Sequence, residues 1–287
     1  MLQELVAVHD SFITAMKAKQ GVLGAWYFGS LAHGTTDEYS DIDIVFLAEG
    51  DWFTSVDAQL DALLKGACDE IVLRWEESFN SAAIKNYGYL ICHNQKLFQY
   101  DVFLLNKALI DDFMCQIHYT NLNAQDIVFD KDGSVRQLAE KSIKGAPRHE
   151  EIRRIIDTYW FHMQMSAKYF ARGDFFKLEG VLRILMDTHA ALLLTAYDKT
   201  TWGGSASKLH FIPKDKQKHL MRYACTSDFA MVRNNLAQSA EWLGEDVADV
   251  ASADDLGYHQ HLAKIVMPDW QCKTSDLSRI NPADETR

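Results

Sequence analysis

Two aspartates at alternate positions of an apolar stretch constrain this chain more than any other feature of its sequence. The run Asp41-Ile42-Asp43-Ile44-Val45-Phe46 predicts a β-strand that extends from Asp41 to Leu47. Side chains two residues apart in a strand point to the same face, so the carboxylates of Asp41 and Asp43 should lie roughly 7 Å apart along the chain. Two like charges in such a position are costly unless a cation lies between them.

A Gly-Ser pair precedes these aspartates, with ten residues between Ser30 and Asp41. Ala25 to Phe28 is typical of a buried strand, and Gly29-Ser30 predicts the turn at its end and the start of a helical turn. The N–H groups and hydroxyl of such a turn can bind phosphate, which Gly29 allows to approach the backbone. Mg²⁺ binds one or two carboxylates and completes its shell with water and phosphate oxygens. Solvated aspartates on a strand face are the alternative, but the Gly-Ser pair favours a metal and phosphate site.

A third aspartate lies in another predicted strand. The segments Tyr87 to Cys92 and Leu97 to Leu105 predict two strands joined by a hairpin at His93-Asn94-Gln95-Lys96. Asp101 stands among apolar and aromatic residues of the second strand. Neighbouring strands lie about 4.8 Å apart, so its carboxylate can reach a metal that the first two aspartates hold. A solvated position on an edge strand is the alternative, since Gln99 shares its face.

The Gly-Ser and Asp-x-Asp motifs together resemble a known signature. An apolar residue, Gly29-Ser30, ten residues and Asp41-Ile42-Asp43-Ile44 are similar to the signature of the DNA polymerase β-like nucleotidyltransferase superfamily. Within the spacer, the pattern Gly34-x-x-Asp37-x-Tyr39-Ser40-Asp41 resembles the antibiotic-modifying branch, the aminoglycoside and lincosamide nucleotidyltransferases. The resemblance covers only this short stretch of the chain.

This resemblance implies an enzyme, a Mg²⁺-dependent nucleotidyltransferase. It would transfer a nucleoside monophosphate, AMP from ATP, to a hydroxyl of a small molecule and release pyrophosphate. The resemblance implies that Asp41, Asp43 and Asp101 form the catalytic and metal-binding site, with Asp101 binding metal or taking the proton from the hydroxyl. Gly29 and Ser30 would hold the nucleotide phosphates. The antibiotic branch further implies a role in antibiotic resistance.

Two residues in the second half of the chain resemble further features of that branch. The segment Trp202-Gly203-Gly204-Ser205-Ala206-Ser207-Lys208 is similar to a Trp-to-Lys loop, which implies that Lys208 contacts the triphosphate. A solvated lysine in a linker is the alternative. Glu179, near the start of a predicted helix, loosely resembles a catalytic or drug-binding glutamate, and an exposed helix face is its alternative. None of the eleven histidines has a spacing typical of metal ligands, and His259 and His261 are expected at the surface.

The order of the predicted elements indicates an α+β fold. Further strands are expected at 70–75 and 127–129, and helices at 2–19, at 51–64 with Asp51 as N-cap, and from 150 onward at 150–172, after Asp174, at 214–225, 228–243 and 254–266. The last twenty residues are polar and expected to be loosely held. We therefore expect an N-terminal nucleotidyltransferase-fold mixed sheet with flanking helices in residues 1–146 and a C-terminal helical bundle that binds substrate in residues 147–287. A ligand site is expected where the two domains join.

The net charge of −11 indicates which kinds of molecule the protein can bind. A protein that grips nucleic acid needs an electropositive face, so no nucleic-acid partner is expected. An acidic surface helps to attract a cationic small molecule, although acidity that serves only solubility is the alternative. No stretch approaches about eighteen uninterrupted apolar residues and the N-terminus lacks signal-peptide features, which predicts a cytoplasmic protein without a membrane partner. Assembly as a homodimer is left open.

A second hypothesis keeps the fold and changes the acceptor. The chain would modify or neutralise a protein partner, as in a toxin–antitoxin pair, with the helical bundle as the docking surface. A purely nucleotide-binding regulator is a third hypothesis, and the presence of all three aspartates argues against it. Acidic walls with room for a sugar would favour the small cationic acceptor, whereas a flat apolar patch would favour the protein partner.

Overall fold

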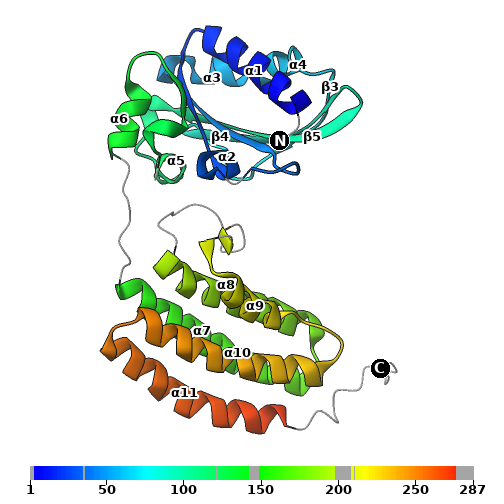
Figure 1. Cartoon of the computed structure of the whole chain (residues 1–287), viewed down its shortest axis with the longest axis vertical. Helices are drawn as coiled ribbons and strands as arrows, with labels where there is room; N and C mark the ends of the chain where they lie inside the picture. Colours follow the sequence, from blue (N-terminus) through cyan, green and yellow to red (C-terminus); the bar gives the residue numbers. More distant parts are fainter. Residues whose placement is uncertain are drawn as a thin grey trace. The chain divides into compact units, whose positions relative to one another are not determined.

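The computed structural model describes residues 3–34, 36–120, 122–141, 149–197, 208–209 and 211–275. These residues fall into two compact units, one that holds the described residues up to Lys141 and one that holds those from His149 onward (Figure 1). Each unit is described by itself. The predicted boundary between residues 146 and 147 lies outside the described residues, and its position stays a prediction.

The N-terminal unit contains both helices and strands. Its elements are α1 (Gln3–Ala18), β1 (Val22–Tyr27), α2 (Gly29–His33), β2 (Ile42–Ala48), η1 (Gly50–Trp52), α3 (Phe53–Asp57), α4 (Leu60–Lys65), β3 (Glu70–Glu76), β4 (Ile84–His93), β5 (Lys96–Asn106), η2 (Lys107–Leu109), α5 (Phe113–Tyr119), η3 (Ala124–Asp126), β6 (Ile127–Asp130) and α6 (Ser134–Lys141).

The strands form one mixed, six-stranded sheet in the order β3-β4-β5-β2-β1-β6. β2 and β5 run parallel, and the other neighbouring strands run antiparallel. A parallel pair needs a long crossover, and between β2 and β5 the chain forms α3, α4 and the strands β3 and β4. With the helices on its faces, this sheet and the C-terminal helices confirm the predicted α+β fold.

One face of the sheet is covered by α1, α3 and α4 (Figure 1). Phe12 of α1 packs edge-on against Phe46 and Tyr100, with ring centroids 5.7 and 5.6 Å apart. His9 lies on the same side of α1, and its two ring nitrogens form hydrogen bonds of 2.7 and 2.9 Å with the hydroxyls of Tyr100 and Tyr27. These contacts fix the register of the helix on β1, β2 and β5.

The opposite face of the sheet is covered in part. Cys115 of α5 and Leu138 of α6 pack with Trp26 and Phe103 of the sheet in a second hydrophobic core. Towards β3 this face lies open, because the second hydrophobic core includes no residue of β3. Trp75 on β3 is 61% exposed. The open part of this face is where polar groups of the sheet meet solvent.

The predicted helix at 51–64 is wrong as a single element. The chain forms the three short helices η1, α3 and α4 there. Trp52 lies so close to Gly21 that a Cβ on the glycine would be 2.2 Å from the Cβ of Trp52, and the N–H of Glu49 donates to the carbonyl of Gly21. This contact holds the segment at the end of β1. Asp51 therefore lies inside η1 and does not cap a longer helix.

The predicted hairpin between β4 and β5 is confirmed. Asn94 and Gln95 have φ angles of 51° and 63°, as a two-residue turn that matches the twist of its strands requires. The flanking residues His93 and Lys96 are paired. β5 lies between β4 and β2, so the edge-strand alternative for Asp101 is wrong.

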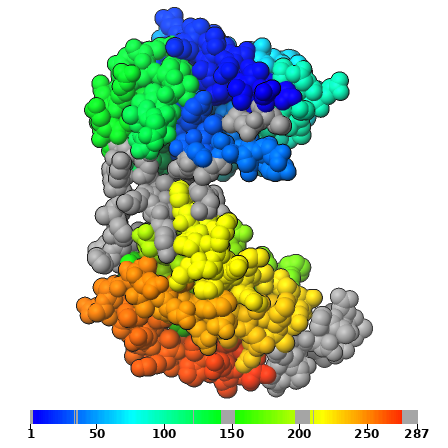
Figure 2. All heavy atoms as spheres, viewed as in Figure 1, coloured from blue at the N-terminus to red at the C-terminus, as the bar shows by residue number. Residues whose placement is uncertain are grey.

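The C-terminal unit is a helical bundle. Its elements are α7 (His149–Arg172), α8 (Phe175–Tyr197), α9 (Lys214–Leu220), η5 (Met221–Tyr223), α10 (Phe229–Val250) and α11 (Ala253–Thr274). α7 packs against both α8 and α11, and Figure 2 shows α11 in orange to red at the outside of this unit. Among the described helices, none combines the length and apolar composition that a membrane span requires.

The last helix is longer than its sequence pattern predicts. α11 continues to Thr274 because Trp270 is completely buried, with its ring 5.9 Å from that of Phe170 and its N–H donating to the hydroxyl of Ser166 at 2.7 Å. The expectation of a loosely held segment is therefore wrong as far as Thr274. His259, expected at the surface, is buried and accepts a hydrogen bond of 3.2 Å from the indole of Trp160.

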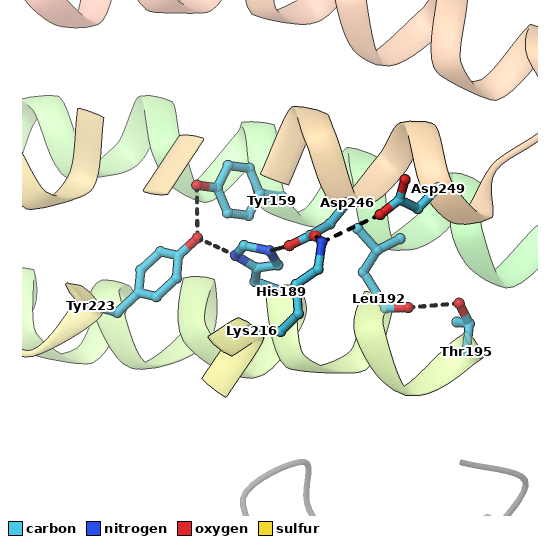
Figure 3. Close-up of polar contacts among 8 residues, drawn as sticks. All are labelled: Tyr159, His189, Leu192, Thr195, Lys216, Tyr223, Asp246 and Asp249. Carbon is cyan, nitrogen blue, oxygen red and sulfur yellow. Dashed lines mark hydrogen bonds and ion pairs between the residues drawn. The ribbon is translucent and has the colours of Figure 1, made fainter. Parts of the chain in front are cut away.

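A chain of buried polar groups crosses the helical unit (Figure 3). His189 Nε2 lies 2.7 Å from the carboxylate of Asp246, and His189 Nδ1 lies 2.9 Å from the hydroxyl of Tyr223. Burial lowers the pKa of His189, so the ring is neutral and donates from Nε2 while Nδ1 accepts. Tyr223 therefore donates to the ring and accepts from Tyr159 at 3.0 Å. Lys216 completes the chain by donating to Asp246.

Replacement of Asp246 by alanine should reduce the free energy of unfolding of this unit by about 3 kcal/mol, because it leaves a buried ring and an ammonium without their shared partner. Asp249 offers a matched control. It binds the same lysine at 3.3 Å, but its side chain is 67% exposed, so Asp249→Ala should change stability by less than about 0.5 kcal/mol. Chemical denaturation followed by circular dichroism measures both values. Equal losses in the free energy of unfolding would show that the buried polar groups add no stability of their own.

Candidate active site

Three carboxylates meet on the open face of the sheet. The parallel register of β2 and β5 places Asp43 directly opposite Asp101, and Asp41 immediately precedes β2. One carboxylate oxygen from each residue lies within 4.8 Å of the others. In the part of the chain that the structure describes, these residues form the group of carboxylates suited to a metal ion. The predicted convergence of Asp41, Asp43 and Asp101 is therefore present in the fold.

Two glycines make room for these carboxylates. Gly29 has a φ of +60°, and a Cβ there would lie 2.1 Å from an Asp43 carboxylate oxygen. A Cβ on Gly88, in the middle of β4, would lie 2.9 Å from a carboxylate oxygen of Asp101. Gly88 is not among the site residues predicted from the sequence. A glycine inside a strand marks a close approach of another group, and Tyr87-Gly88-Tyr89 carries that signal.

The carboxylates repel one another and are partly withdrawn from water. Burial raises the pKa of Asp43 to about 7, and the charges of Asp41 and Asp101 add to this effect. Burial also raises the pKa of Asp101 to about 6. A hydrogen bond of 2.9 Å from the amide of Gln99 lowers this pKa, whereas the charges of Asp41 and Glu77 raise it. The pKa of Asp41 is raised by burial. The group thus retains a proton near neutral pH, and a cation could take that proton's place.

Ser30 offers an unused hydroxyl beside this group. It is the second residue of α2, which follows β1 directly, and the N–H of Phe28 donates to the carbonyl of Asp43 at 3.1 Å. The Oγ atom of Ser30 is buried and has no hydrogen-bond partner among the described residues. An unsatisfied buried hydroxyl costs about 1–3 kcal/mol, so this atom is suited to an outside partner. The fit favours a divalent cation with a phosphate group at Gly29 and Ser30.

The spacer between Ser30 and Asp41 is shaped by its own residues. Gly34 ends α2 with a φ of +64°, as a left-handed helix cap requires. Asp37 accepts hydrogen bonds from the N–H of Tyr39 at 2.9 Å and from the hydroxyl of Ser40 at 3.0 Å. This turn returns the chain from α2 to the start of β2. The residues that suggested the antibiotic-modifying branch therefore have a local structural role.

The two residues predicted in the second half of the chain belong to the C-terminal unit. Glu179 is exposed on α8, in line with the alternative of a solvated helix face. Of the predicted Trp-to-Lys loop, residues 202–207 lie outside the described residues, whereas Lys208 is half-buried. A role for Lys208 at the triphosphate, and a ligand site where the units join, stay predictions.

A cavity of about 420 Å³ adjoins the carboxylates on the open face of the sheet. Its lining residues come from β2, β3, β4, β5 and the segment after β3: Asp43, Leu73, Trp75, Glu77, Phe79, Asn86, Gly88, Tyr89, Leu90, Gln99, Asp101 and Phe103. Of these, Asp43 and Asp101 are site residues that the sequence predicts. The others could not be recognised without the pairing of β3, β4 and β5, because they are far apart in the sequence.

One comparison with known proteins, the match to a family model, supports the same reaction class. Residues 9–91 match the family model of the nucleotidyltransferase domain, which spans Gly29, Ser30, Asp41 and Asp43 and ends before Asp101. A solved nucleotidyltransferase-like protein from Exiguobacterium sibiricum 255-15 is 11% identical, with a TM-score of 0.36 over 96% of this chain and 89% of that chain. No curated protein matches the sequence. The predicted resemblance is thus confirmed at the level of a nucleotidyltransferase domain.

Gly29→Ala should disturb the carboxylate group, because its new Cβ must displace the side chain of Asp43. Gly34→Ala is the matched control: its φ is also positive, but no atom lies within 4 Å of the new Cβ. Both variants should lose about 1–2 kcal/mol of stability to backbone strain. If Mg²⁺ and ATP raise the unfolding temperature, only Gly29→Ala should also lose that rise. A similar ligand response in the two variants would show that the close approach of Gly29 and Asp43 is unimportant.

Without divalent cations, stability should fall as the pH rises from about 4 to 7. The unfolded Asp43 loses its proton near pH 3.8, whereas the folded carboxyl keeps it to about pH 7, so the folded state binds more protons in this window. The expected loss is on the order of 2 kcal/mol. Denaturant titrations in a chelator measure it. Asp43→Asn should flatten the profile, and stability that rises with pH in both proteins would contradict the assignment.

Proposed function

We propose that this protein transfers a nucleoside monophosphate, AMP from ATP, to a hydroxyl of a small molecule such as an aminoglycoside or lincosamide antibiotic, and releases pyrophosphate. The observation that carries the proposal is the register of β2 and β5, which brings the carboxylates of Asp43 and Asp101 together with that of Asp41. The nucleotidyltransferase domain in residues 9–91 supports the reaction class. The pattern in the spacer and the net charge of −11 support a cationic antibiotic as acceptor.

Each residue of the site has a separate proposed role. Asp41, Asp43 and Asp101 would hold Mg²⁺ through carboxylate oxygens, and their crowding makes such an occupant favourable. When bound, Mg²⁺ lowers the pKa of an attacking hydroxyl and neutralises charge on a triphosphate. The buried hydroxyl of Ser30 and the backbone at Gly29 would contact the nucleotide phosphates. Lys208 would add a contact to the triphosphate.

The transfer itself is a displacement at the α-phosphorus. The acceptor hydroxyl oxygen forms the new bond to phosphorus, and the bond from phosphorus to the bridging oxygen breaks, so that pyrophosphate leaves with the electron pair. The proton of the hydroxyl passes to a carboxylate. We assign this role to Asp101 as the alternative to metal binding, because it lies opposite Asp43 and lines the cavity beside the carboxylates.

Pyrophosphate release by the purified protein with ATP and Mg²⁺, measured against a panel of aminoglycosides and lincosamides, tests the proposal. Release should depend on a drug, vanish in Asp43→Asn and fall by a factor of about 100 or more in Asp101→Asn. Asp51→Asn, which changes an exposed carboxylate of the same unit, should retain full activity.

Two results would count against this proposal. Full activity in Asp43→Asn would refute the role of the carboxylate group. If no drug of the panel caused pyrophosphate release while ATP still bound, the second hypothesis would be favoured, in which the acceptor is a protein partner.

A further inference from the structure

The cavity next to the carboxylates has a floor built from paired residues of four strands. Trp75 on β3 pairs with Gly88 on β4, Gly88 pairs with Asp101 on β5, and Asp101 pairs with Asp43 on β2. Paired residues point to the same face of a sheet, so the indole and the carboxylates share one surface. Gly88 contributes no side chain between them, so Asp101 and Trp75 approach each other across it: a Cβ on Gly88 would lie 2.9 Å from an Asp101 carboxylate oxygen and 3.7 Å from the Cβ of Trp75.

One wall of this cavity is apolar and exposed. The side chain of Trp75 is 61% exposed, and Leu73, which lies two residues earlier on the same face, is 48% exposed. Phe79 and Phe103 extend the apolar lining. A large aromatic side chain exposed beside a cavity offers a flat surface against which the apolar face of a ligand can pack.

The charged groups of the cavity are all acidic. Asp43, Asp101 and Glu77 line it, and its lining residues, which all belong to the described chain, include no lysine, arginine or histidine. The one basic residue of β3, Arg74, points to the other face, where it lies over the ring of Tyr87 at 4.0 Å. Where Asp43 and Asp101 hold Mg²⁺, Glu77 is the carboxylate of this lining that remains to attract a cationic group.

We propose that this cavity is the acceptor subsite and that it takes a hydroxylated small molecule with both an apolar face and a cationic group. The apolar face packs on Trp75 and Leu73, the cation faces Glu77, and the hydroxyl lies at the end of the row, beside Asp101. Trp75 and Glu77 then determine specificity. The inference rests on the proposed function, since it places the acceptor beside the carboxylates that act on it.

Two antibiotics serve as probes, because they differ in the property that the cavity selects. Lincomycin has one basic amine and apolar groups beside its hydroxyls, whereas kanamycin has several amines and no extended apolar face. Calorimetry on the full chain with Mg²⁺ and a non-hydrolysable ATP analogue should show binding of lincomycin and weaker binding of kanamycin. Trp75→Ala should raise the Kd of lincomycin about five- to tenfold. Glu77→Gln should raise it about threefold and weaken its dependence on salt.

Controls separate this inference from the proposed function. Phe113, 72% exposed and outside the cavity lining, provides the matched aromatic control, and Phe113→Ala should leave the Kd unchanged. Affinity for the ATP analogue should be the same in all three variants, because none of them touches Gly29 or Ser30. In turnover, Trp75→Ala should raise KM for lincomycin with little change in kcat.

Two results would overturn the subsite: absence of lincomycin binding, or an unchanged Kd in Trp75→Ala. An unchanged Kd together with a change of Trp75→Ala from dimer to monomer would mark β3 as a self-association surface. Failure of the proposed function gives a different result: the Asp43→Asn variant would then bind Mg²⁺ and the ATP analogue as tightly as the unmodified protein.

Discussion

The parallel pairing of β2 with β5 is the constraint on which the site depends. Ile42, Ile44, Tyr100 and Val102 of these strands are completely buried on the face that α1, α3 and α4 cover. A shift of one residue would turn one of these apolar sets towards solvent, so hydrophobic burial fixes the register. The same register sets Asp43 opposite Asp101 on the other face. The apolar core therefore holds like charges together that would otherwise move apart.

This arrangement stores unfavourable energy at one place in an otherwise well-packed sheet. The pKa of Asp43 near 7 measures the cost of ionising it, and the buried hydroxyl of Ser30 adds an unsatisfied group beside it. Gly29 and Gly88 give up side-chain packing so that the carboxylates fit. Each feature costs stability in the protein without a ligand and would be relieved by a cation and a phosphate group at this place.

The helical unit contains a network of buried polar groups that form hydrogen bonds with one another. His189, Asp246, Tyr223 and Tyr159 satisfy one another in a continuous chain, and Lys216 supplies the counter-charge at its end. A fully satisfied network needs no outside partner, so we interpret it as structural. This network contrasts with the unsatisfied hydroxyl of Ser30 beside the carboxylates, although the bundle also holds buried atoms without a hydrogen-bond partner, in Gln164 and His219.

The sequence by itself determined the strands around Gly29-Ser30 and Asp41-x-Asp43, the β4–β5 hairpin and the helical character of the second half, because alternation and helical periodicity are properties of a single segment. It also indicated that Asp101 could reach the other carboxylates. Only the tertiary structure decided that β5 lies inside the sheet, that Trp75, Gly88 and Asp101 form one row, and that Trp270 and His259 are buried. Those facts follow from pairing and packing between distant segments, and no local pattern records which segments will meet.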